Sequence, residues 1–365
     1  MPYAPDRLPR RLQELPPRQA RFCLEIEAFF REIAPPDLAP GATLTVAFSH
    51  GADSTALLLA LACLAPRLRV SLAACHLDHG LRASSAAEAE RAGAFCRDMG
   101  IAFYGERVDV AALAKARGAG LEEAGRLARY AFFERVRGRT GAALTCLGHH
   151  LDDLCEDVIL RLVRGAGWPA LGGMPAADPE RALVRPLLMT PRARIEEFLR
   201  ELRASWIEDP SNAGRDYRRN RIRGDVLPRL TEENPGFGRA VARLWRLARL
   251  DAEYFDGLTA SHLPPLTQDG PAARPGAIVV GASELAGAHP ALRLRLLKAA
   301  LDRLGPGESR ADSLFDLADA WARGRMGGMF RFPGGKLARV APGGVECLRV
   351  AGARRAGGAK KRPGG

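Results

Sequence analysis

Residues 49–54, "SHGADS", join an apolar strand-like run to an apolar helix-like run. At such a turn the free backbone N–H groups and the positive end of the helix converge, and both attract an anion. The two serines add hydroxyl donors, and Asp53 is suited to cap the helix. We expect a phosphate site here, with a plain capped turn as the alternative. Its candidate residues are Ser49, His50, Gly51, Ala52, Asp53 and Ser54.

Three other polar clusters carry side chains that can transfer protons, hold ammonium groups or bind phosphates. Each follows a strand-like run or stands on an amphipathic helix pattern. Seen singly, each has an ordinary explanation as a capping group, a complement to a helix dipole or a surface ion pair. Together they favour one shared site. They are "CHLDH" (75–79) with Arg82, "EEAGRLARY" (122–130) and "GHHLDDLCE" (148–156).

The elements that must position these clusters alternate between strands and helices from residue 43 onward. This alternation predicts a parallel, doubly wound α/β sheet with helices on both faces, whose ligands bind at the carboxyl ends of the strands. An amphipathic run before it predicts a helix at 18–33. The predicted strands are 44–48, 69–77, 102–110 and 142–150, and the predicted helices are 54–65, 85–99, 121–138 and 152–164.

The pattern changes after the basic run "RDYRRNRIR" at 215–223. Residues 231–325 have mostly helical patterns, residues 329–350 are strand-like, and the basic, low-complexity end predicts disorder. We therefore expect an N-terminal extension (1–40), the α/β domain (41–228), a mostly helical second domain (229–350) and a tail (351–365).

The chain of 365 residues carries a net charge of +12, which favours a polyanionic partner such as nucleic acid. Its seven cysteines lie mostly in apolar runs and include no CxxC pair, so we expect buried thiols and neither a disulfide framework nor a zinc site. No apolar run reaches the roughly 20 residues of a membrane span, and no secretory signal is visible. We expect a cytoplasmic protein without membrane contact.

Loop 49–54 resembles the SGGxDS pyrophosphate loop of the N-type ATP pyrophosphatases, the PP-loop proteins with an adenine nucleotide α-hydrolase-like fold. The segments "HLDHGLR", "ExxxRxxRY", "HHxDDxxE" and "DPSN…RNRIR…P" follow in order up to residue 228. With them, the chain resembles the tRNA(Ile)-lysidine synthetase family. The last segment is the most specific, because other pyrophosphatase families do not share it. The chain resembles a short-form member without the further tRNA-binding domain of longer members.

The resemblance implies that ATP adenylates the C2 oxygen of the wobble cytidine in an isoleucine tRNA with a CAU anticodon. The ε-amine of free lysine then attacks C2, AMP leaves, and lysidine forms. The implied cofactors and partners are therefore ATP, Mg²⁺, lysine and this tRNA, with no other metal. We leave open whether the chain forms a homodimer.

The resemblance also implies roles for individual residues. The loop binds ATP phosphates, and His76 stands where this fold meets adenine. The other residues divide into catalytic and tRNA-binding groups. The catalytic candidates are Asp53, Arg126, His150, Asp152, Asp153 and Glu156, with His149 and Glu122 as further candidates; the tRNA-binding candidates are Arg129, Arg215, Arg218, Arg219, Arg221 and Arg223.

His50 departs from the family loop, which has a second glycine at this position. Glycine permits a positive φ and lets the backbone approach a phosphate closely. Histidine tolerates the left-handed region better than most residues, and a protonated imidazole would suit a phosphate neighbour. The alternative is that the side chain crowds the site. Leu154 and Asp157 also replace the family's usual glutamine and threonine.

Three other functions stay open on the residues alone. A thiolating pyrophosphatase would need paired cysteines for a cluster or a sulfur relay, and the sequence has no CxxC. A metallohydrolase could use the HxDH and HHxDD spacings as metal ligands. A catalytically impaired tRNA-binding paralogue would result if His50 disables the loop.

Overall fold

The computed structural model describes residues 7–80, 85–208, 218–263 and 277–350. The chain forms two compact units: unit 1 comprises residues 1–166 and 170–246, and unit 2 comprises residues 167–169 and 247–365. The boundary predicted at 228 falls inside unit 1. Arg82, Arg215 and the predicted tail lie outside the described residues.

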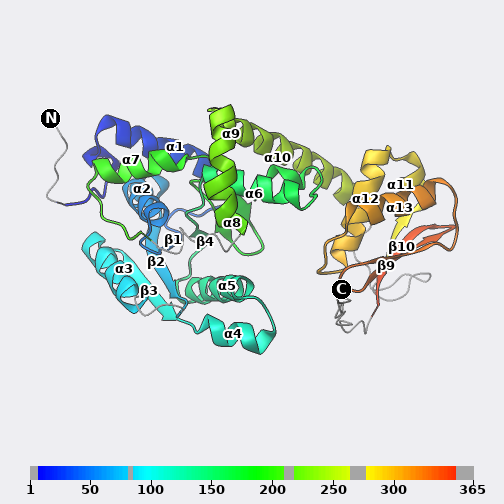
Figure 1. The fold of residues 1–365 in the computed structure, drawn as a ribbon, viewed down its shortest axis with the longest axis horizontal. Coiled ribbons are helices and arrows are strands. Elements are labelled where there is room, and N and C mark those ends of the chain that lie inside the picture. Colours follow the sequence, from blue (N-terminus) through cyan, green and yellow to red (C-terminus); the bar gives the residue numbers. More distant parts are fainter. Residues whose placement is uncertain (1–6, 81–84, 209–217, 264–276, 351–365) are drawn as a thin grey trace, which may run out of the picture. The chain divides into compact units, whose positions relative to one another are not determined.

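Unit 1 is built on a six-stranded sheet in the order β3-β2-β1-β4-β6-β5 (Figure 1). All neighbouring strands are parallel except β5 and β6. The chain fills one side of β1 with β2 and β3 and then crosses to β4 on the other side, so β1 and β4 form the switch point of the sheet. The predicted parallel α/β fold is confirmed. The strands are β1 (Thr43–Ala47), β2 (Ser71–Asp78), β3 (Ala102–Arg107), β4 (Leu144–Cys146), β5 (Ala177–Asp178) and β6 (Leu183–Val184).

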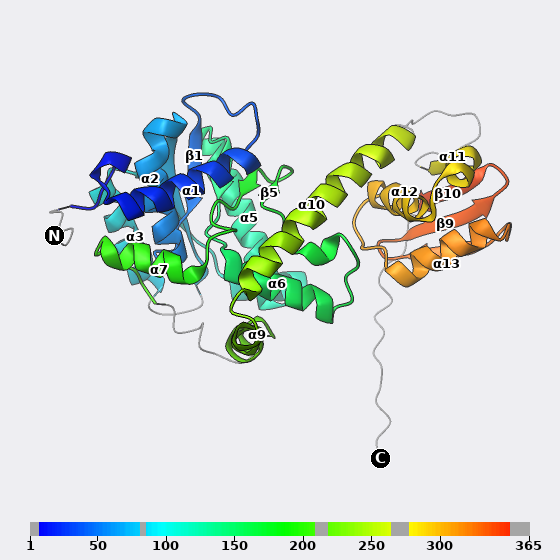
Figure 2. The ribbon, with the colours of Figure 1, turned by 90° about the horizontal axis from the view of Figure 1, so that it is seen from above.

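Helices cover both faces of this sheet, with α2 on one face and α5 on the other (Figures 1 and 2). Helix α10 begins in unit 1 and continues into unit 2. The helices of unit 1 are α1 (Pro17–Ile33), α2 (Ala52–Leu68), α3 (Ser85–Met99), α4 (Val110–Arg117), α5 (Leu121–Thr140), α6 (Leu151–Val163), α7 (Arg192–Glu201), α8 (Arg218–Arg221), the π-helix η4 (Ile222–Val226), α9 (Leu227–Glu233), α10 (Phe237–His262) and the short 3-10 turns η1 (Leu12–Glu14) and η2 (Ala170–Gly172).

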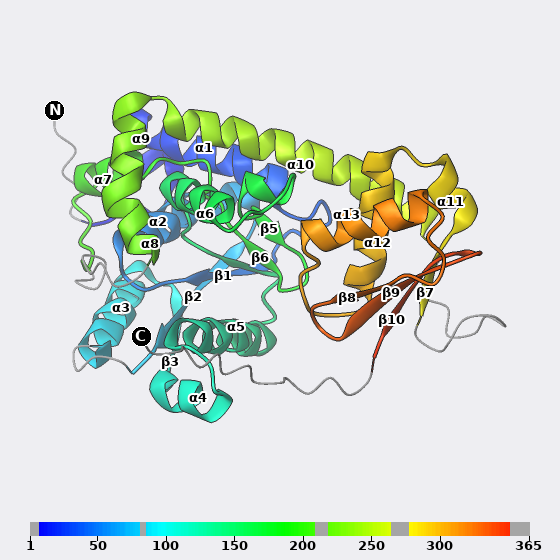
Figure 3. The same ribbon diagram turned by 45° about the vertical axis from the view of Figure 1, so that its right-hand side comes forward.

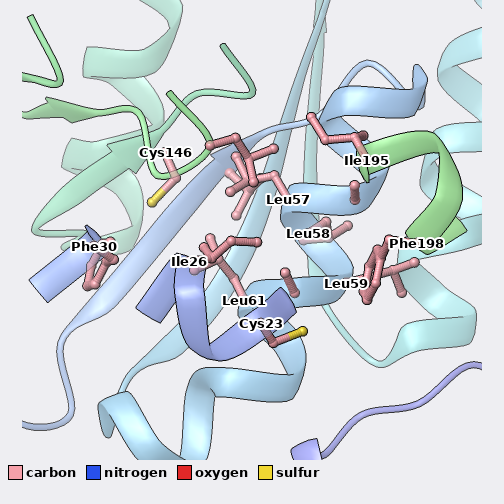
Figure 4. Packing of buried hydrophobic residues seen from close by; sticks show 14 of the residues in the cluster. Cys23, Ile26, Phe30, Leu57, Leu58, Leu59, Leu61, Cys146, Ile195 and Phe198 are labelled. Carbon is pink, nitrogen blue, oxygen red and sulfur yellow. The ribbon is translucent and has the colours of Figure 1, made fainter. Parts of the chain in front are cut away.

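The main core of unit 1 lies between the sheet and helices α1, α2, α3, α6 and α7. Figure 4 shows Leu57, Leu58 and Leu61 of α2 packed among residues of α1 and α7. Helix α1 buries Ile26 and Phe30 in this core, although its residues fall in the segment predicted as an extension. The extension therefore contributes part of the α/β core.

Two predicted strands are shorter in the structure. The strand predicted to reach residue 110 ends at Arg107, because the Asp109 carboxylate accepts a hydrogen bond from the Ala112 amide (2.9 Å) and caps α4. The strand predicted at 142–150 covers only Leu144–Cys146, since the residues after it form the loop that leads into α6. Strands β5 and β6 have two residues each and carry no periodic signal that a sequence could show.

Unit 2 combines helices with a four-stranded antiparallel sheet in the order β7-β10-β9-β8 (Figure 3). The strand-like end predicted at 329–350 forms β8, β9 and β10, whereas β7 and its pairing with β10 were not predicted. Helices α12 and α13 pack with this sheet in a second core. The elements are β7 (Ile278–Gly281), α11 (Ala282–Gly287), α12 (Pro290–Arg303), α13 (Ala311–Ala322), β8 (Met329–Phe332), β9 (Lys336–Ala341) and β10 (Gly344–Arg349).

All seven cysteines are buried and unbridged, which confirms the predicted thiols. Within the described part of the chain, no helix combines the length and the apolar character that crossing a membrane requires.

The packing of α1 can be tested by truncating one side chain. Phe30 is 1% exposed, so Phe30→Ala should lower the free energy of unfolding by about 3–5 kcal/mol. Urea denaturation followed by circular dichroism measures this change. Leu24 lies on the same helix and is 38% exposed, so Leu24→Ala is the control and should change stability little. Equal effects of the two substitutions would contradict a core role for α1.

Candidate active site

The phosphate loop, residues 49–54, follows Phe48 at the carboxyl end of β1 and enters the first turn of α2 at Ala52. The Ser54 hydroxyl donates to the Gly51 carbonyl oxygen (3.1 Å) and lies 3.2 Å from the Ser49 hydroxyl. The Gly51 amide approaches the Ser49 hydroxyl at 3.3 Å. Amides in the first turn of α2 have no intrahelical partner and can donate hydrogen bonds to an anion.

The loop after β4 passes directly against this turn. A Cβ atom on Gly148 would lie 3.2 Å from the Asp53 carbonyl carbon and 3.2 Å from the Ser54 nitrogen. Only a residue without a side chain fits such an approach without displacing the backbone. Gly148 therefore lets the loop after β4 deliver the following histidines and carboxylates to the phosphate loop.

His50 adopts φ 61°, the left-handed conformation that its family position predicts for glycine. Its ring is 6% exposed and packs against Phe48 and Phe95. Burial lowers the pKa of His50, and Arg91 and His76 act in the same direction, while the Ser205 backbone opposes them. Burial among the aromatic rings therefore disfavours the protonated imidazole that would suit a phosphate neighbour.

The histidines at the end of β2 do not form a metal centre. The His76 Nδ1–H donates to the Phe48 carbonyl oxygen (2.8 Å), which attaches β2 to the start of the phosphate loop. Asp78 accepts from the Gly80 amide (2.8 Å) and pairs with Arg107, so it shapes its own turn. Among the described residues, no three His, Cys, Asp or Glu side chains are arranged to hold a metal ion.

His150 connects the phosphate loop to the acidic end of α6. Its side chain is 1% exposed, and its Nε2 lies 3.6 Å from Asp53 Oδ1 and 3.4 Å from Asp153 Oδ2. Asp153 also accepts a hydrogen bond from the His150 amide (3.1 Å). Burial opposes ionisation of Asp153, but His150 and Arg219 outweigh it and lower its pKa. Two carboxylates and an imidazole thus meet at the switch point.

Asp153 and Glu156 are held by two arginines from the basic segment that follows α7. Arg219 donates to Glu156 (2.7 Å) and to Asp153 (2.9 Å), and Arg223 donates to the same two carboxylates. Glu156 is fully buried, so these charge-assisted bonds compensate its desolvation. Figure 3 shows α8, which carries Arg219, beside α6. In this structure both arginines bind carboxylates, and their contact with tRNA phosphates stays a prediction.

Asp152, predicted to be catalytic, has a structural contact. Its Oδ1 accepts a hydrogen bond from the Arg192 amide (3.1 Å), which lies at the first residue of α7. The carboxylate therefore satisfies one of the free N–H groups of that helix and complements its dipole. Its other oxygen is available for a further role, since the side chain is 41% exposed.

Two further arginines and a histidine lie near Asp153 and Glu156, which we call the acidic pair. Burial lowers the pKa of His149 to about 4, and Arg185, Arg219 and Arg129 strengthen the effect. Arg185 is 7% exposed and donates to the Pro175 carbonyl oxygen (2.8 Å), while its Nε has no hydrogen-bond partner. Within the described residues, neither Arg129 nor Arg185 forms an ion pair with a carboxylate. We call Arg129, His149 and Arg185 the basic cluster.

The basic cluster is suited to an anion. Arg185 is a buried guanidinium, which keeps its proton and is costly without a negative partner, whereas Arg129 is exposed. Arg185 was missed by the sequence analysis, although one signal was available. It is a single charge inside the apolar run "ALVRPLLM", and a charge inside a buried run requires an explanation.

Arg126, predicted to be catalytic, lies elsewhere. It forms a two-point ion pair with Glu123 (2.9 and 2.7 Å), and both side chains are about half exposed. It lines a cavity of about 520 Å³ with Tyr130 and Arg181, and no residue of the phosphate loop contributes to that cavity. On a helix, residues three apart share a face only roughly, and here Arg129 alone turns toward His149.

Of the remaining predicted residues, two lie on α8. Arg218 and Arg221 are exposed at the ends of this short helix. Arg215 lies outside the described residues. Glu122 is exposed on α5 and is not brought to the acidic pair.

Asp53 offers a test of the electrostatics. Burial raises its pKa, and Asp153 adds to the effect, against His150 and Arg192. The folded state therefore disfavours the ionised carboxylate, and this cost appears as the pH rises through the folded pKa. Asp53→Asn should raise the Tm of the ligand-free protein at pH 7, and the gain should vanish below about pH 4.

Thermal denaturation across this pH range measures the effect. The exposed Asp37→Asn is the matched control and should leave the Tm unchanged at every pH. A lower Tm for Asp53→Asn at pH 7 would mean that the charge stabilises the free protein, contrary to this account.

Comparisons with known proteins agree with the fold. A family model for the PP-loop domain matches residues 21–230. A curated tRNA(Ile)-lysidine synthase of Nitratidesulfovibrio vulgaris is 48% identical over 312 residues, covering 82% of this chain and 90% of the relative. Relatives of the same name from Geobacter sulfurreducens and Solibacter usitatus are 41% and 35% identical, and the chain spans only 45% and 64% of their length.

A solved structure of a U34-tRNA thiolase from Methanococcus maripaludis shares the fold, with a TM-score of 0.52 at 18% identity over 63% of this chain and 80% of that chain. Identity at this level carries the fold and not the reaction. The curated relatives favour the lysidine interpretation over the metallohydrolase interpretation. On the PP-loop match and the 48% identity over most of its length, this chain belongs to the tRNA(Ile)-lysidine synthase family.

Proposed function

We propose that this protein ligates lysine to C2 of the wobble cytidine in the isoleucine tRNA with a CAU anticodon, releasing AMP and pyrophosphate. One observation carries the proposal within the site: His150 lies between Asp53 of the phosphate loop and Asp153 of α6, at 3.6 and 3.4 Å. This places an anion-binding turn next to carboxylates that can hold an amine and accept its proton. The names of the relatives support the tRNA substrate.

ATP would bind with its phosphates on the first turn of α2, where free amides and the Ser49 and Ser54 hydroxyls point to one place. Mg²⁺ fits this position, because Asp53 Oδ1 is buried without a hydrogen-bond donor and carboxylate oxygens are its preferred ligands. When bound, the ion would offset the phosphate charge. His76 would remain near the adenine side, since it is fixed to the loop through Phe48.

In the first step the cytidine C2 oxygen attacks the α-phosphorus of ATP, a P–O bond forms, and pyrophosphate leaves. This converts a poor leaving group into AMP. The lysine ε-amine then forms the C–N bond at C2, and the C2–O bond breaks with loss of AMP. The amine must shed a proton because its unperturbed pKa is about 10.4. Asp153 and His150, which adjoin each other, would accept it.

Lysine would bind across the acidic pair and the basic cluster. Its ammonium groups would compete with Arg219 and Arg223 for Asp153 and Glu156. Its carboxylate would meet the guanidinium groups of Arg129 and Arg185, which form no ion pair within the described ranges and whose geometry suits two oxygens. His149 is neutral there, because its pKa is lowered to about 4, and it would donate or accept a hydrogen bond.

The tRNA would meet the same edge of the sheet. Arg218 and Arg221, at the exposed ends of α8, and Arg215 stay our candidates for phosphate contacts, which fix register more than sequence. Arg219 and Arg223 would act on the backbone only after leaving the carboxylates.

The direct test is transfer of radiolabelled lysine to an isoleucine tRNA transcript. We expect incorporation that requires ATP and the CAU anticodon and that releases one AMP per lysine. A transcript with an altered anticodon is the matched control. No incorporation by the wild-type protein, despite measurable ATP binding, would overturn the proposal and favour an impaired tRNA-binding paralogue.

Two arginines on α5 allow a proposed substrate contact to be compared with a surface ion pair. Arg129→Gln should lower kcat/KM for lysidine formation by roughly one to two orders of magnitude, because it removes a charged contact to the substrate. Arg126→Gln, three residues away, should stay near wild type, since its partner is Glu123. Steady-state kinetics with both variants decides, and a larger loss from Arg126→Gln would reverse the assignment.

Recognition of the lysine carboxylate can be tested through Arg185. Arg185→Met keeps the volume but removes the charge, so KM for lysine should rise tenfold or more. Wild type should prefer lysine to lysinamide, which lacks the carboxylate, and the variant should lose that preference. If the variant still prefers lysine, the carboxylate binds elsewhere.

A further inference from the structure

His50, in the phosphate loop, has a backbone conformation that is unusual for a residue with a side chain. Its φ of 61° lies in the left-handed region, where the backbone of a residue other than glycine is strained. Such a conformation persists only when surrounding contacts determine it. The contacts that hold His50 are therefore informative about the loop.

The ring of His50 is held by two phenylalanines from different elements. Its centroid lies 5.5 Å from that of Phe48, which follows β1, and 5.0 Å from that of Phe95 on α3. The two phenylalanine rings lie 5.5 Å apart, so the three rings form one cluster. With 6% of its surface exposed, His50 covers apolar area that a glycine would leave to water.

The backbone around His50 is held as well. The Ile207 amide donates to the His50 carbonyl oxygen (2.7 Å), which attaches the loop to the segment after α7. Two residues before His50, the Phe48 carbonyl oxygen accepts a hydrogen bond from His76 Nδ1 (2.8 Å). His50 stands between Ser49 and Gly51. The Ser49 hydroxyl and the Gly51 amide both belong to the phosphate loop. A fixed His50 therefore fixes both neighbours.

We propose that His50 is a positioning residue, whose ring packs between Phe48 and Phe95 and holds the phosphate loop in its nucleotide-binding conformation before ATP arrives. The proposal rests on ATP being the substrate, as proposed above. A glycine at this position leaves the loop free to sample many conformations, and a packed ring removes them in advance. The histidine that stands in place of the family's glycine therefore maintains the conformation of the loop through the packing of its ring.

The ring acts through packing and not through charge. Burial lowers the pKa of His50 and so favours the neutral imidazole, and Arg91 and His76 act in the same direction, against the Ser205 backbone. Asn at position 50 tolerates the left-handed region but offers no ring, so it separates the backbone requirement from the packing.

Binding of ATP to the full-length protein, measured by calorimetry without tRNA or lysine, tests the consequence. His50→Gly, His50→Asn and Phe95→Ala should each weaken ATP binding about tenfold, because apparent affinity falls with the fraction of loops in the competent conformation. Met99→Ala, one turn further along α3 and buried in the same core, is the control for general loosening and should bind ATP like wild type.

Hydrogen exchange of the ligand-free protein tests the cause. Amides of residues 49–54 should exchange about tenfold faster in His50→Gly than in wild type, with β4 unchanged. Unaltered exchange, or a glycine variant that binds ATP as tightly as wild type, overturns the positioning role. Wild type that fails to bind ATP refutes the proposed function instead, and the exchange comparison still decides whether the ring holds the loop.

Discussion

The site depends on the adjacency of two parallel strands. Because β1 and β4 are hydrogen-bonded neighbours, the segments that follow them emerge at the same edge, and the Gly148 backbone lies against the first turn of α2. This contact brings His150 to within 3.6 Å of Asp53. A Cβ atom at position 148 would lie 3.2 Å from the Asp53 and Ser54 backbone, so these atoms would have to shift by a few tenths of an ångström. The chemistry therefore rests on a close approach of backbones.

Charge in the site is arranged for ligands more than for stability of the free protein. Glu156 and Asp153 are balanced by Arg219 and Arg223. In contrast, Arg185 is buried and forms no ion pair with a carboxylate among the described residues, and Asp53 has a raised pKa. Uncompensated buried charge costs free energy, and it persists where a bound partner supplies the missing sign. A phosphate with its cation and an amino-acid carboxylate would supply both.

The departure at His50 shows how one family position can be met by two physical solutions. Glycine satisfies a left-handed backbone by lacking a side chain, whereas His50 satisfies it with aromatic neighbours that enclose its ring. The aromatic neighbours come from Phe48 and from Phe95, which is 45 positions away in the sequence. The loop sequence alone permits a protonated ring beside a phosphate. Burial lowers the pKa of His50 and favours the neutral ring.

The sequence by itself determined the parallel α/β class, the phosphate loop and the acidic segment, because strand–helix alternation and short-range spacing are local properties. It did not determine which predicted residues meet. Arg126 and Arg129 look equivalent on one helix, and Arg219 and Arg223 look like surface charges until α8 is placed beside α6. Arg185 has no motif at all. These assignments needed the tertiary structure, because ion pairing and burial depend on contacts between segments far apart in the chain, which no local pattern encodes.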